Sequence, residues 1–276
     1  MGNIIRYIIN NFKIYYPNIR LNSARKYLEK LGEGSVDLEL DKASGIATIF
    51  INNPKKKNAM SGKMMVEFYR SVCVLEDWNE GKALIIQGVG DCFCSGGDLD
   101  VFKQIAADRK TKEMSFFMTY TMNKLSELPL ISFSFITGRG AFGGGAEIAL
   151  SSDFCLIHPS SKIGFVHATM GVTPAWGGGF RLRQRVGMKT SLQLLLQSKS
   201  INAENAVNIG LVDSICNSIS EVQTFMSDKI HHDPVVVKSI KKTQLATESS
   251  ICSEIFDELL GAESNRKAIA AKLKHL

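Results

Sequence analysis

The chain has 276 residues, an apolar fraction of 45% and a formal net charge of +6. This length fits one substantial domain with additions, or two modest domains. The charge is too weak and too scattered to indicate a nucleic-acid partner, although it suits a polyanionic small molecule. No apolar run approaches bilayer-spanning length, so we expect a soluble protein with no membrane partner.

The N-terminus has a basic, acid-free composition. Residues 1–28 carry Arg6, Lys13, Arg20, Arg25 and Lys26 among Ile and Tyr. This pattern fits a mitochondrial targeting peptide or an amphipathic helix, around Ser23 to Leu31, that packs on the domain. We favour the helix and expect the segment to remain on a cytosolic protein. Met1-Gly2 could begin a myristoylation signal, but Arg6 stands where that signal needs Ser or Thr, so we do not predict myristoylation.

The six cysteines form no Cys-x-x-Cys pair. They are Cys73, Cys92, Cys94, Cys155, Cys216 and Cys252. Several stand in apolar segments, which predicts core residues in a reducing compartment.

The first elements alternate between strand and helix. Ser35–Leu40 and Ile46–Ile51 predict a hairpin, and the polar loop Asn52–Met60 follows it. Ser61 is a suitable N-cap for a helix that runs to about Trp78. Ala83–Gly88 then predicts a buried strand.

A first Gly-rich turn, Gly90–Leu99, follows that strand, and Asp98 or Asp100 can cap what comes next. A helix is predicted from about Lys112 to Glu127. It leads into the β-branched run Ile131–Thr137, which predicts another buried strand.

A second Gly-rich turn, Gly140–Glu147, joins this strand to a short helix over Ala146–Leu150. Glycines bring the backbone close to a ligand because no Cβ intervenes. The first N–H groups of the helix lack intrahelical partners and lie at the positive end of its dipole. The turn lacks the P-loop Lys-Ser/Thr and the dinucleotide spacing. It therefore fits an oxyanion hole or simply a tight packing turn.

The remaining chain becomes mainly helical. Phe154–Ile157 and Lys162–Phe165 predict short strands, and the loop Pro174–Gly179 follows. Helical periodicity starts at Phe180, is interrupted at Leu211–Asp213, and ends in an amphipathic helix over Glu254–Leu276.

These elements predict an α/β fold in which repeated β-β-α and β-α units precede helices too small to form their own core. We divide the chain into an N-terminal extension (1–34), a core (35–200) and a helical C-terminal region (201–276).

Four motifs together resemble the crotonase (enoyl-CoA hydratase/isomerase) superfamily. They are Ser95-Gly96-Gly97-Asp98, Gly143-Gly144-Gly145, Pro174-x-Trp176-Gly177-Gly178 and Ala206-x-x-x-Gly210-Leu211-Val212. The resemblance covers the chain from about Ser35 to its end. It implies a spiral of β-β-α units, a homotrimer or homohexamer built through the C-terminal region, and an acyl-CoA thioester substrate. The carbonyl oxygen of that thioester would be held by the N–H groups of Gly97 and Gly144, which suits a developing enolate.

Hydratases of this superfamily use two glutamates to activate water. Glu147 matches the first of them, while His167 stands at the position of the second. Glu147 fits either an acid or base, or a first-turn carboxylate that favours the helix dipole. His167 fits a catalytic role or a hydrogen-bonded histidine at the rim of the core.

The windows Lys162–His167 and Met170–Gly178 resemble one branch in particular, the ethylmalonyl-CoA decarboxylases. This resemblance implies removal of CO₂ from ethylmalonyl-CoA, and less readily methylmalonyl-CoA, as a metabolite-repair reaction in the cytosol. It implies no metal and no cofactor other than the coenzyme A of the substrate. His167 or Glu147 would then protonate the enolate.

Further residues are candidates for substrate binding. Phe165 and Trp176 would form an apolar wall around the leaving carboxylate, and Trp176 equally fits a packing aromatic. The loop residues Lys55, Lys56, Lys57 and Asn58 lie where relatives pass near the CoA adenine and 3′-phosphate. Asp100 departs from relatives that place a lysine there.

Two alternatives remain open. A hydratase or isomerase that uses Glu147 alone is less consistent with His167. A non-catalytic binding protein is less consistent with the retained Gly97, Gly144 and Glu147, and the chain lacks a basic-aromatic stripe for nucleic acid.

Overall fold

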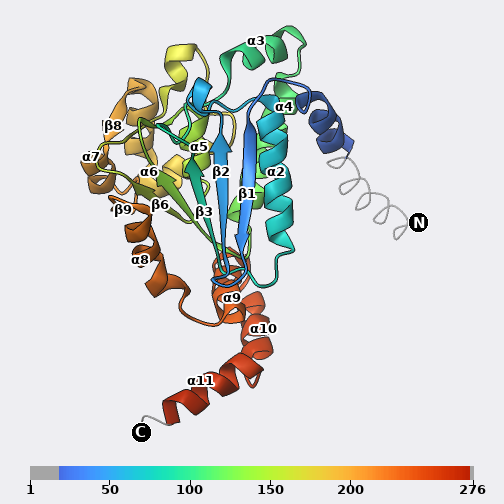
Figure 1. Cartoon of the computed structure of the whole chain (residues 1–276), viewed down its shortest axis with the longest axis vertical. Helices are drawn as coiled ribbons and strands as arrows, with labels where there is room; N and C mark the ends of the chain where they lie inside the picture. Colours follow the sequence, from blue (N-terminus) through green and yellow to red (C-terminus); the bar gives the residue numbers. More distant parts are fainter. Residues whose placement is uncertain (1–18, 274–276) are drawn as a thin grey trace.

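The computed structural model describes residues 19–273. The chain forms an α/β core with a helical C-terminal arm (Figure 1). The strands are β1 (Ser35–Asp41), β2 (Ile46–Asn52), β3 (Ala83–Gly88), β4 (Ile131–Ile136), β5 (Gly140–Phe142), β6 (Phe154–Ile157), β7 (Lys162–Gly164), β8 (Ser200–Asn202) and β9 (Ser214–Ile215). A mixed sheet has the order β1-β2-β3-β4-β6-β9, and a small sheet has the order β5-β7-β8.

Ten numbered helices and two 3₁₀ turns complete the described chain, together with an unnumbered helix over residues 19–28. They are η1 (Pro54–Lys56), α2 (Gly62–Glu76), α3 (Leu99–Ala107), α4 (Thr111–Ser126), α5 (Gly144–Ala149), η2 (Val166–Met170), α6 (Gly178–Gln197), α7 (Ala203–Asn208), α8 (Ile219–Ile230), α9 (Pro234–Leu245), α10 (Ser249–Leu259) and α11 (Glu263–Leu273).

The predicted hairpin is confirmed as the antiparallel pair β1–β2, in which Ser35 lies opposite Asn52 and Asp41 lies opposite Ile46. Strands β2, β3, β4, β6 and β9 then run parallel. The Ser61 hydroxyl accepts a hydrogen bond from the Met64 N–H, which confirms the predicted N-cap of α2.

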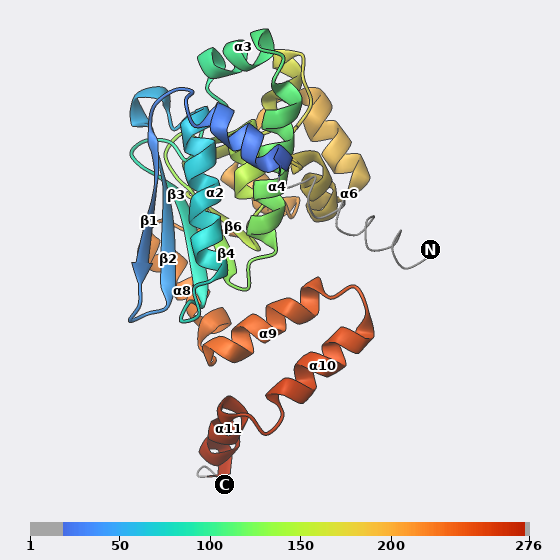
Figure 2. The same ribbon diagram turned by 90° about the vertical axis from the view of Figure 1, so that its right-hand side faces the viewer.

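The central strands are buried on both faces. Leu84 and Ile86 of β3 pack with α2 and α4, while Ala83 and Ile85 face α8 on the other side. Successive side chains of a strand alternate between faces, so a parallel strand covered on both sides reads as a continuous apolar run. Figure 2 shows α2 and α4 together on one side of the sheet.

The helix predicted around Ser23 to Leu31 is present, and residues 19–28 of the described chain are helical. Leu21, Ala24 and Leu28 are buried in the main core. The Tyr27 hydroxyl donates to Asp108, and burial together with this carboxylate raises the pKa of Tyr27 to about 12. The prediction that the N-terminal segment remains on the protein also involves residues 1–18, which lie outside the described residues.

Helix α5 begins two residues earlier than the predicted Ala146. Gly143 is its N-cap, with φ 53° and ψ −124°, a conformation that L residues with a Cβ rarely adopt. Gly144 is therefore the first helical residue, and Glu147 lies in the first turn.

The single amphipathic helix predicted over Glu254–Leu276 is wrong. Gly261 lies in the left-handed region, with φ 78°, and separates α10 from α11. Figures 1 and 2 show α9, α10 and α11 extending from the core as an arm. Within residues 19–273, no helix has the length and hydropathy needed to cross a bilayer.

A buried lysine joins this arm to the sheet. Lys241 of α9 donates to the carbonyl oxygen of Leu130 at 2.9 Å and to the Asp153 carboxylate at 2.6 Å. Burial lowers the pKa of Lys241, and the neighbouring Asp153 opposes this effect. The ion pair thus ties α9 to the N-terminal ends of β4 and β6.

Candidate active site

The two Gly-rich turns predicted from the sequence lie against each other. The Cys94 N–H donates to the carbonyl of Gly140 at 3.3 Å, and the Phe142 N–H donates to the carbonyl of Cys94 at 2.9 Å. A Cβ atom built on Gly96 would lie 3.4 Å from the backbone nitrogen of Gly144. Segments separated by almost fifty residues in the sequence therefore meet at one place.

Two backbone donors at this junction are unused: within residues 19–273, neither the Gly97 N–H nor the Gly144 N–H has a hydrogen-bond acceptor. Gly144 is the first residue of α5, and such a position has no intrahelical acceptor. Around Gly97, Met60 donates to the Gly96 carbonyl at 2.8 Å and accepts from the Asp98 N–H at 3.0 Å. This parallel bridge directs the peptide N–H of Gly97 away from Met60.

Two aromatic rings explain why both positions are glycine. A Cβ on Gly97 would lie 2.1 Å from the Phe102 ring, and one on Gly144 would lie 2.3 Å from the Trp176 ring. The two rings pack edge to face with centroids 6.4 Å apart. Trp176 was predicted from the sequence, whereas Phe102, which lies on the unpredicted helix α3, was not.

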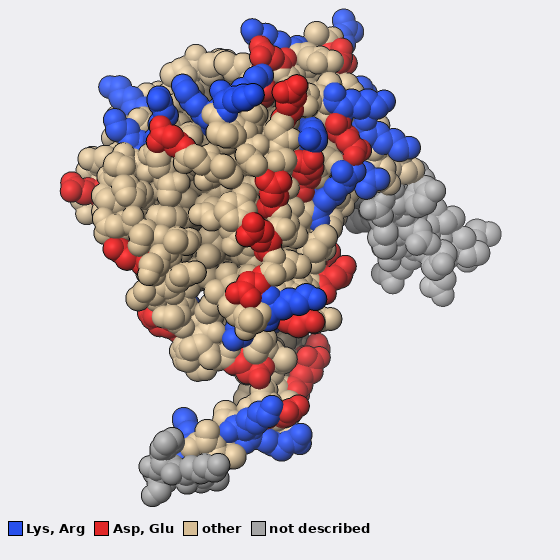
Figure 3. Space-filling model, in the orientation of Figure 1, with Lys and Arg blue, Asp and Glu red and all other residues tan. Residues whose placement is uncertain are grey.

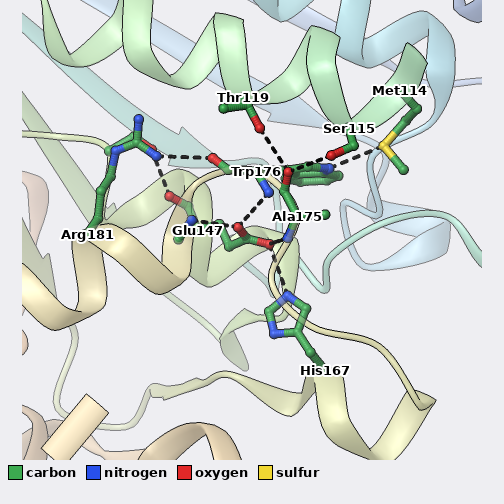
Figure 4. Close-up of polar contacts among 10 residues, drawn as sticks. Met114, Ser115, Thr119, Glu147, His167, Ala175, Trp176 and Arg181 are labelled. Atoms are coloured by element: carbon green, nitrogen blue, oxygen red, sulfur yellow. Dashed lines mark hydrogen bonds and ion pairs between the residues drawn. The ribbon is translucent and has the colours of Figure 1, made fainter. Parts of the chain in front are cut away.

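Glu147 is buried, with 1% of its surface exposed, and it accepts four hydrogen bonds (Figure 4). Its Oε2 accepts from the N–H groups of Trp176 and Gly178, both at 2.8 Å. Its Oε1 accepts from the N–H of Ala175 at 3.3 Å and lies 3.0 Å from Nε2 of His167. Glu147 thus holds the loop of residues 175–178 from inside and positions the histidine ring.

The same loop is also held by side chains of α4 and α6 that were not predicted from the sequence. Ser115 and Thr119 of α4 both donate to the carbonyl of Ala175, at 3.1 and 2.9 Å. Arg181 donates to the carbonyl of Trp176 at 3.0 Å, and burial lowers the pKa of this guanidinium. Figure 4 shows Ser115 and Thr119 on the side of the loop opposite to Glu147 and His167.

The Trp176 side chain is fixed as well. Its indole N–H donates to the sulfur of Met114 at 3.3 Å, and the residue is 2% exposed. The indole donor is therefore already satisfied within the protein.

His167 is 9% exposed and lies in η2, directly after the small sheet. Its ring stacks on Phe165, with centroids 6.3 Å apart and planes inclined by 29°. Nδ1 of His167 is buried and has no hydrogen-bond partner among the described residues. The structure thus brings together Gly97, Gly144, Glu147, His167, Phe165 and Trp176.

The side chain of Asn58 is not available for the predicted role in substrate binding, because it is buried and hydrogen-bonded within the protein. Its side chain is fully buried, donates to the carbonyls of Val89 and Cys92, and accepts from the Asn53 N–H. These bonds hold the loop in place and leave the amide no free group for a ligand.

The three loop lysines are exposed but differ in their surroundings. Lys56 contacts Asp98 at 2.8 Å and Asp100 at 3.1 Å. These hydrogen bonds raise the pKa of Lys56, and Lys56 lowers the pKa of Asp100. Within residues 19–273, Lys55 and Lys57 form no ion pair. Figure 3 shows Lys and Arg side chains gathered at the upper end of the molecule, which is the end where Figure 1 places α3.

The cysteines are all free thiols. Cys92, Cys94, Cys155 and Cys216 are buried, as the sequence predicted, while Cys73 and Cys252 are partly exposed. Burial raises the pKa of Cys94 to about 12, which makes a thiolate nucleophile unsuitable at this turn. No cluster of three or more metal-binding side chains occurs in the part of the chain that the structure describes.

Comparison with known proteins agrees with this geometry. Residues 41–256 match the enoyl-CoA hydratase/isomerase family. Ethylmalonyl-CoA decarboxylase of Mus musculus is 37% identical over 264 residues, which cover 91% of this chain and 81% of that protein. The protein of the same name from Xenopus tropicalis is 37% identical and covers 95% and 92% of the two chains.

Solved structures support the fold. Enoyl-CoA hydratase from Bacillus anthracis aligns with a TM-score of 0.79 at 21% identity, over 87% of this chain and 96% of that one. A Thermobifida fusca protein of the enoyl-CoA hydratase type, in complex with acetoacetyl-CoA, aligns with a TM-score of 0.70 at 21% identity, over 87% and 95%. The chain belongs to the enoyl-CoA hydratase/isomerase (crotonase) family, in the group that includes the ethylmalonyl-CoA decarboxylases.

Proposed function

We propose that this protein decarboxylates ethylmalonyl-CoA, and methylmalonyl-CoA, to the corresponding acyl-CoA. The observation that carries this proposal is the state of Glu147, whose two oxygens already accept three backbone N–H groups and face His167. A hydratase needs carboxylates that are free to position and activate water. The relatives named ethylmalonyl-CoA decarboxylase, at 35–37% identity, support the same reaction.

The two unused glycine donors would stabilise the intermediate. When the bond between C2 and the free carboxylate breaks, CO₂ leaves and the electron pair passes into a thioester enolate. The enolate charge lies largely on one oxygen, and preorganised backbone donors are well suited to hold it. The adjoining turns support the assignment of Gly97 and Gly144 to this oxygen.

The apolar residues around the site would favour loss of the charged carboxylate. Trp176 and Phe165 are 2% exposed, and the Trp176 indole donor already bonds to Met114. A carboxylate placed against these rings would lose hydration, whereas neutral CO₂ loses little. Desolvation of this kind raises the ground state more than the transition state, in which the charge has moved to the oxyanion site.

The enolate must then receive one proton at C2. Glu147 is surrounded by hydrogen-bond donors and is therefore suited to accept rather than donate. His167 is the better donor, because its ring is held by Glu147 and carries a second nitrogen that has no partner among residues 19–273. Transfer of a proton from a doubly protonated His167 leaves a neutral ring, which solvent reprotonates.

Replacing His167 with alanine is expected to lower kcat by roughly 10²-fold or more, as for loss of a positioned general acid. The product formed in D₂O should also change from a single configuration at C2 to a mixture. His232→Ala, which removes an exposed histidine from the loop before α9, is the matched control. A His167→Ala rate within about threefold of wild type, with unchanged stereochemistry, would exclude His167 as the donor.

The enolate itself is tested with wild-type protein and ethylmalonyl-CoA in D₂O. We expect one CO₂ for each butyryl-CoA, and one deuterium at C2 of that product. Failure to release CO₂ would refute the proposed function. Release of CO₂ without deuterium at C2 would refute the enolate route.

Assembly and location are part of the proposal. We propose a homotrimer or homohexamer with no cofactor beyond the CoA of the substrate, acting in the cytosol as a metabolite-repair enzyme. Exposed apolar side chains support an assembly: Met188, Leu192 and Leu196 recur every four residues on α6, Phe256 lies on α10, and Leu260 directly follows α10. Light scattering at micromolar concentration should give three or six times the chain mass, and a monomeric mass would contradict this assembly.

A further inference from the structure

The ammonium group of Lys56 lies between two carboxylates at the N-terminus of α3. Its Nζ contacts Oδ2 of Asp98 at 2.8 Å and Oδ2 of Asp100 at 3.1 Å. Asp98 is the N-cap of α3, and its Oδ1 accepts from the Asp100 N–H at 3.0 Å. The Asp98 side chain is 4% exposed, whereas that of Asp100 is 77% exposed.

The backbone around Lys56 is joined to the turn that carries Gly97. The Ser95 N–H donates to the carbonyl of Lys57 at 3.0 Å, and the Ser95 hydroxyl donates to the carbonyl of Lys56 at 3.3 Å. On the other side of Gly97, the Asp98 N–H donates to the carbonyl of Met60. The Lys56 side chain adds a charged link between the same two segments.

We propose that Lys56 is a positioning residue that holds the Gly97 N–H in place, and that it does not bind a CoA phosphate. If Lys56 turned toward a phosphate, the nearly buried Asp98 carboxylate would lose its cationic partner, which is unfavourable. The single positive charge of Lys56 is also already compensated by two carboxylates, those of Asp98 and Asp100. Contacts to the CoA phosphates then fall to the other exposed lysines of the loop, Lys55 and Lys57. The inference rests on the proposed function, because it assigns Lys56 to the Gly97 donor.

A substrate without phosphates separates the two roles. Ethylmalonyl-CoA and ethylmalonyl-pantetheine share the reacting thioester, but the pantetheine compound lacks every phosphate of CoA. For Lys56→Met we expect kcat to fall by roughly 10- to 100-fold on both substrates, with little change in KM. This loss is smaller than the 10²–10³-fold typical of complete removal of an oxyanion donor.

Three variants complete the test. Lys56→Arg should restore most of the activity, because a guanidinium can bridge both carboxylates. Lys103→Met removes a nearby exposed lysine of α3 and should leave kcat unchanged on both substrates. Asp100→Asn is used if Lys56→Met does not fold. It should lower kcat on both substrates, whereas a phosphate-binding lysine released from Asp100 would bind CoA more tightly.

Binding of CoA alone gives an independent readout, because CoA has no thioester oxygen for Gly97 to hold. Calorimetry should give the same Kd for CoA with wild type and Lys56→Met. Weaker CoA binding by Lys56→Met, with normal turnover of the pantetheine thioester, would overturn the inference while leaving the decarboxylase proposal intact. A wild-type protein that releases no CO₂ would refute the proposed function, and an unchanged Kd would still exclude a phosphate contact by Lys56.

Discussion

Replacing Gly144 with alanine is expected to reduce decarboxylation by at least about 10²–10³-fold, the typical effect of losing one oxyanion donor. The new Cβ would lie 2.3 Å from the Trp176 ring, and this ring cannot move away freely. Trp176 is held through its backbone by Glu147 and Arg181 and through its indole N–H by Met114. The strain would therefore displace the Gly144 N–H from the thioester oxygen.

Gly179→Ala is the matched control for this change. Gly179 lies in the first turn of α6, and its Cβ would meet only Pro174, at an ordinary 3.9 Å. We expect near-wild-type kcat for this control, measured as CO₂ released from ethylmalonyl-CoA. A Gly144→Ala enzyme as active as Gly179→Ala would show that the Gly144 donor contributes nothing to the reaction.

Replacing Glu147 with alanine is expected to lower the free energy of unfolding by about 3 kcal/mol or more. Each buried polar group left without a partner costs roughly 1–3 kcal/mol, and three backbone N–H groups depend on this carboxylate. The change would also release the loop that carries Trp176 and the ring of His167, so activity should be lost with stability.

Urea unfolding measures the stability change. Glu147→Gln should be intermediate, because its amide keeps one accepting oxygen but directs an NH₂ group toward the other donors. Glu204→Ala, which removes an exposed glutamate from the first turn of α7, is the control and should change stability by less than about 0.5 kcal/mol. A loss below about 1 kcal/mol for Glu147→Ala would show that the loop does not depend on Glu147.

Much of the core was predictable from local patterns. The alternation in β1 and β2 and the apolar runs of β3 and β4 predicted their strands, because these residues face a core on one or both sides. Ser61 marked the start of α2 through its capping hydroxyl. The two Gly-rich turns also marked the site, since close backbone approach requires glycine.

The contacts that complete the site depend on residues distant in sequence. Arg181, Ser115 and Thr119 hold the 175–178 loop from α6 and α4, and no local pattern pairs them with it. Lys56 was predicted as a CoA ligand, and its ion pair with Asp98 could not be predicted locally because it joins residues 42 positions apart. Asn58 stood out as a polar loop residue, although its side chain supports the loop internally.

Short or interrupted elements were also missed. Strands β5, β8 and β9 have only two or three residues, too few for a periodic pattern. The break between α10 and α11 depends on one glycine, Gly261, within a segment whose apolar spacing otherwise continues. Helical spacing alone does not fix where a helix ends.

The retained glycine donors and the hydrogen-bonded Glu147 carboxylate suit decarboxylation and not hydration. The most direct test compares the purified protein on ethylmalonyl-CoA, methylmalonyl-CoA and crotonyl-CoA under the same conditions. We predict that kcat/KM for CO₂ release from a malonyl-type thioester exceeds that for crotonyl-CoA hydration by about 10²–10⁴-fold, the range for one missing general acid or base. Rapid hydration of crotonyl-CoA, with no CO₂ from either malonyl-type thioester, would contradict the account.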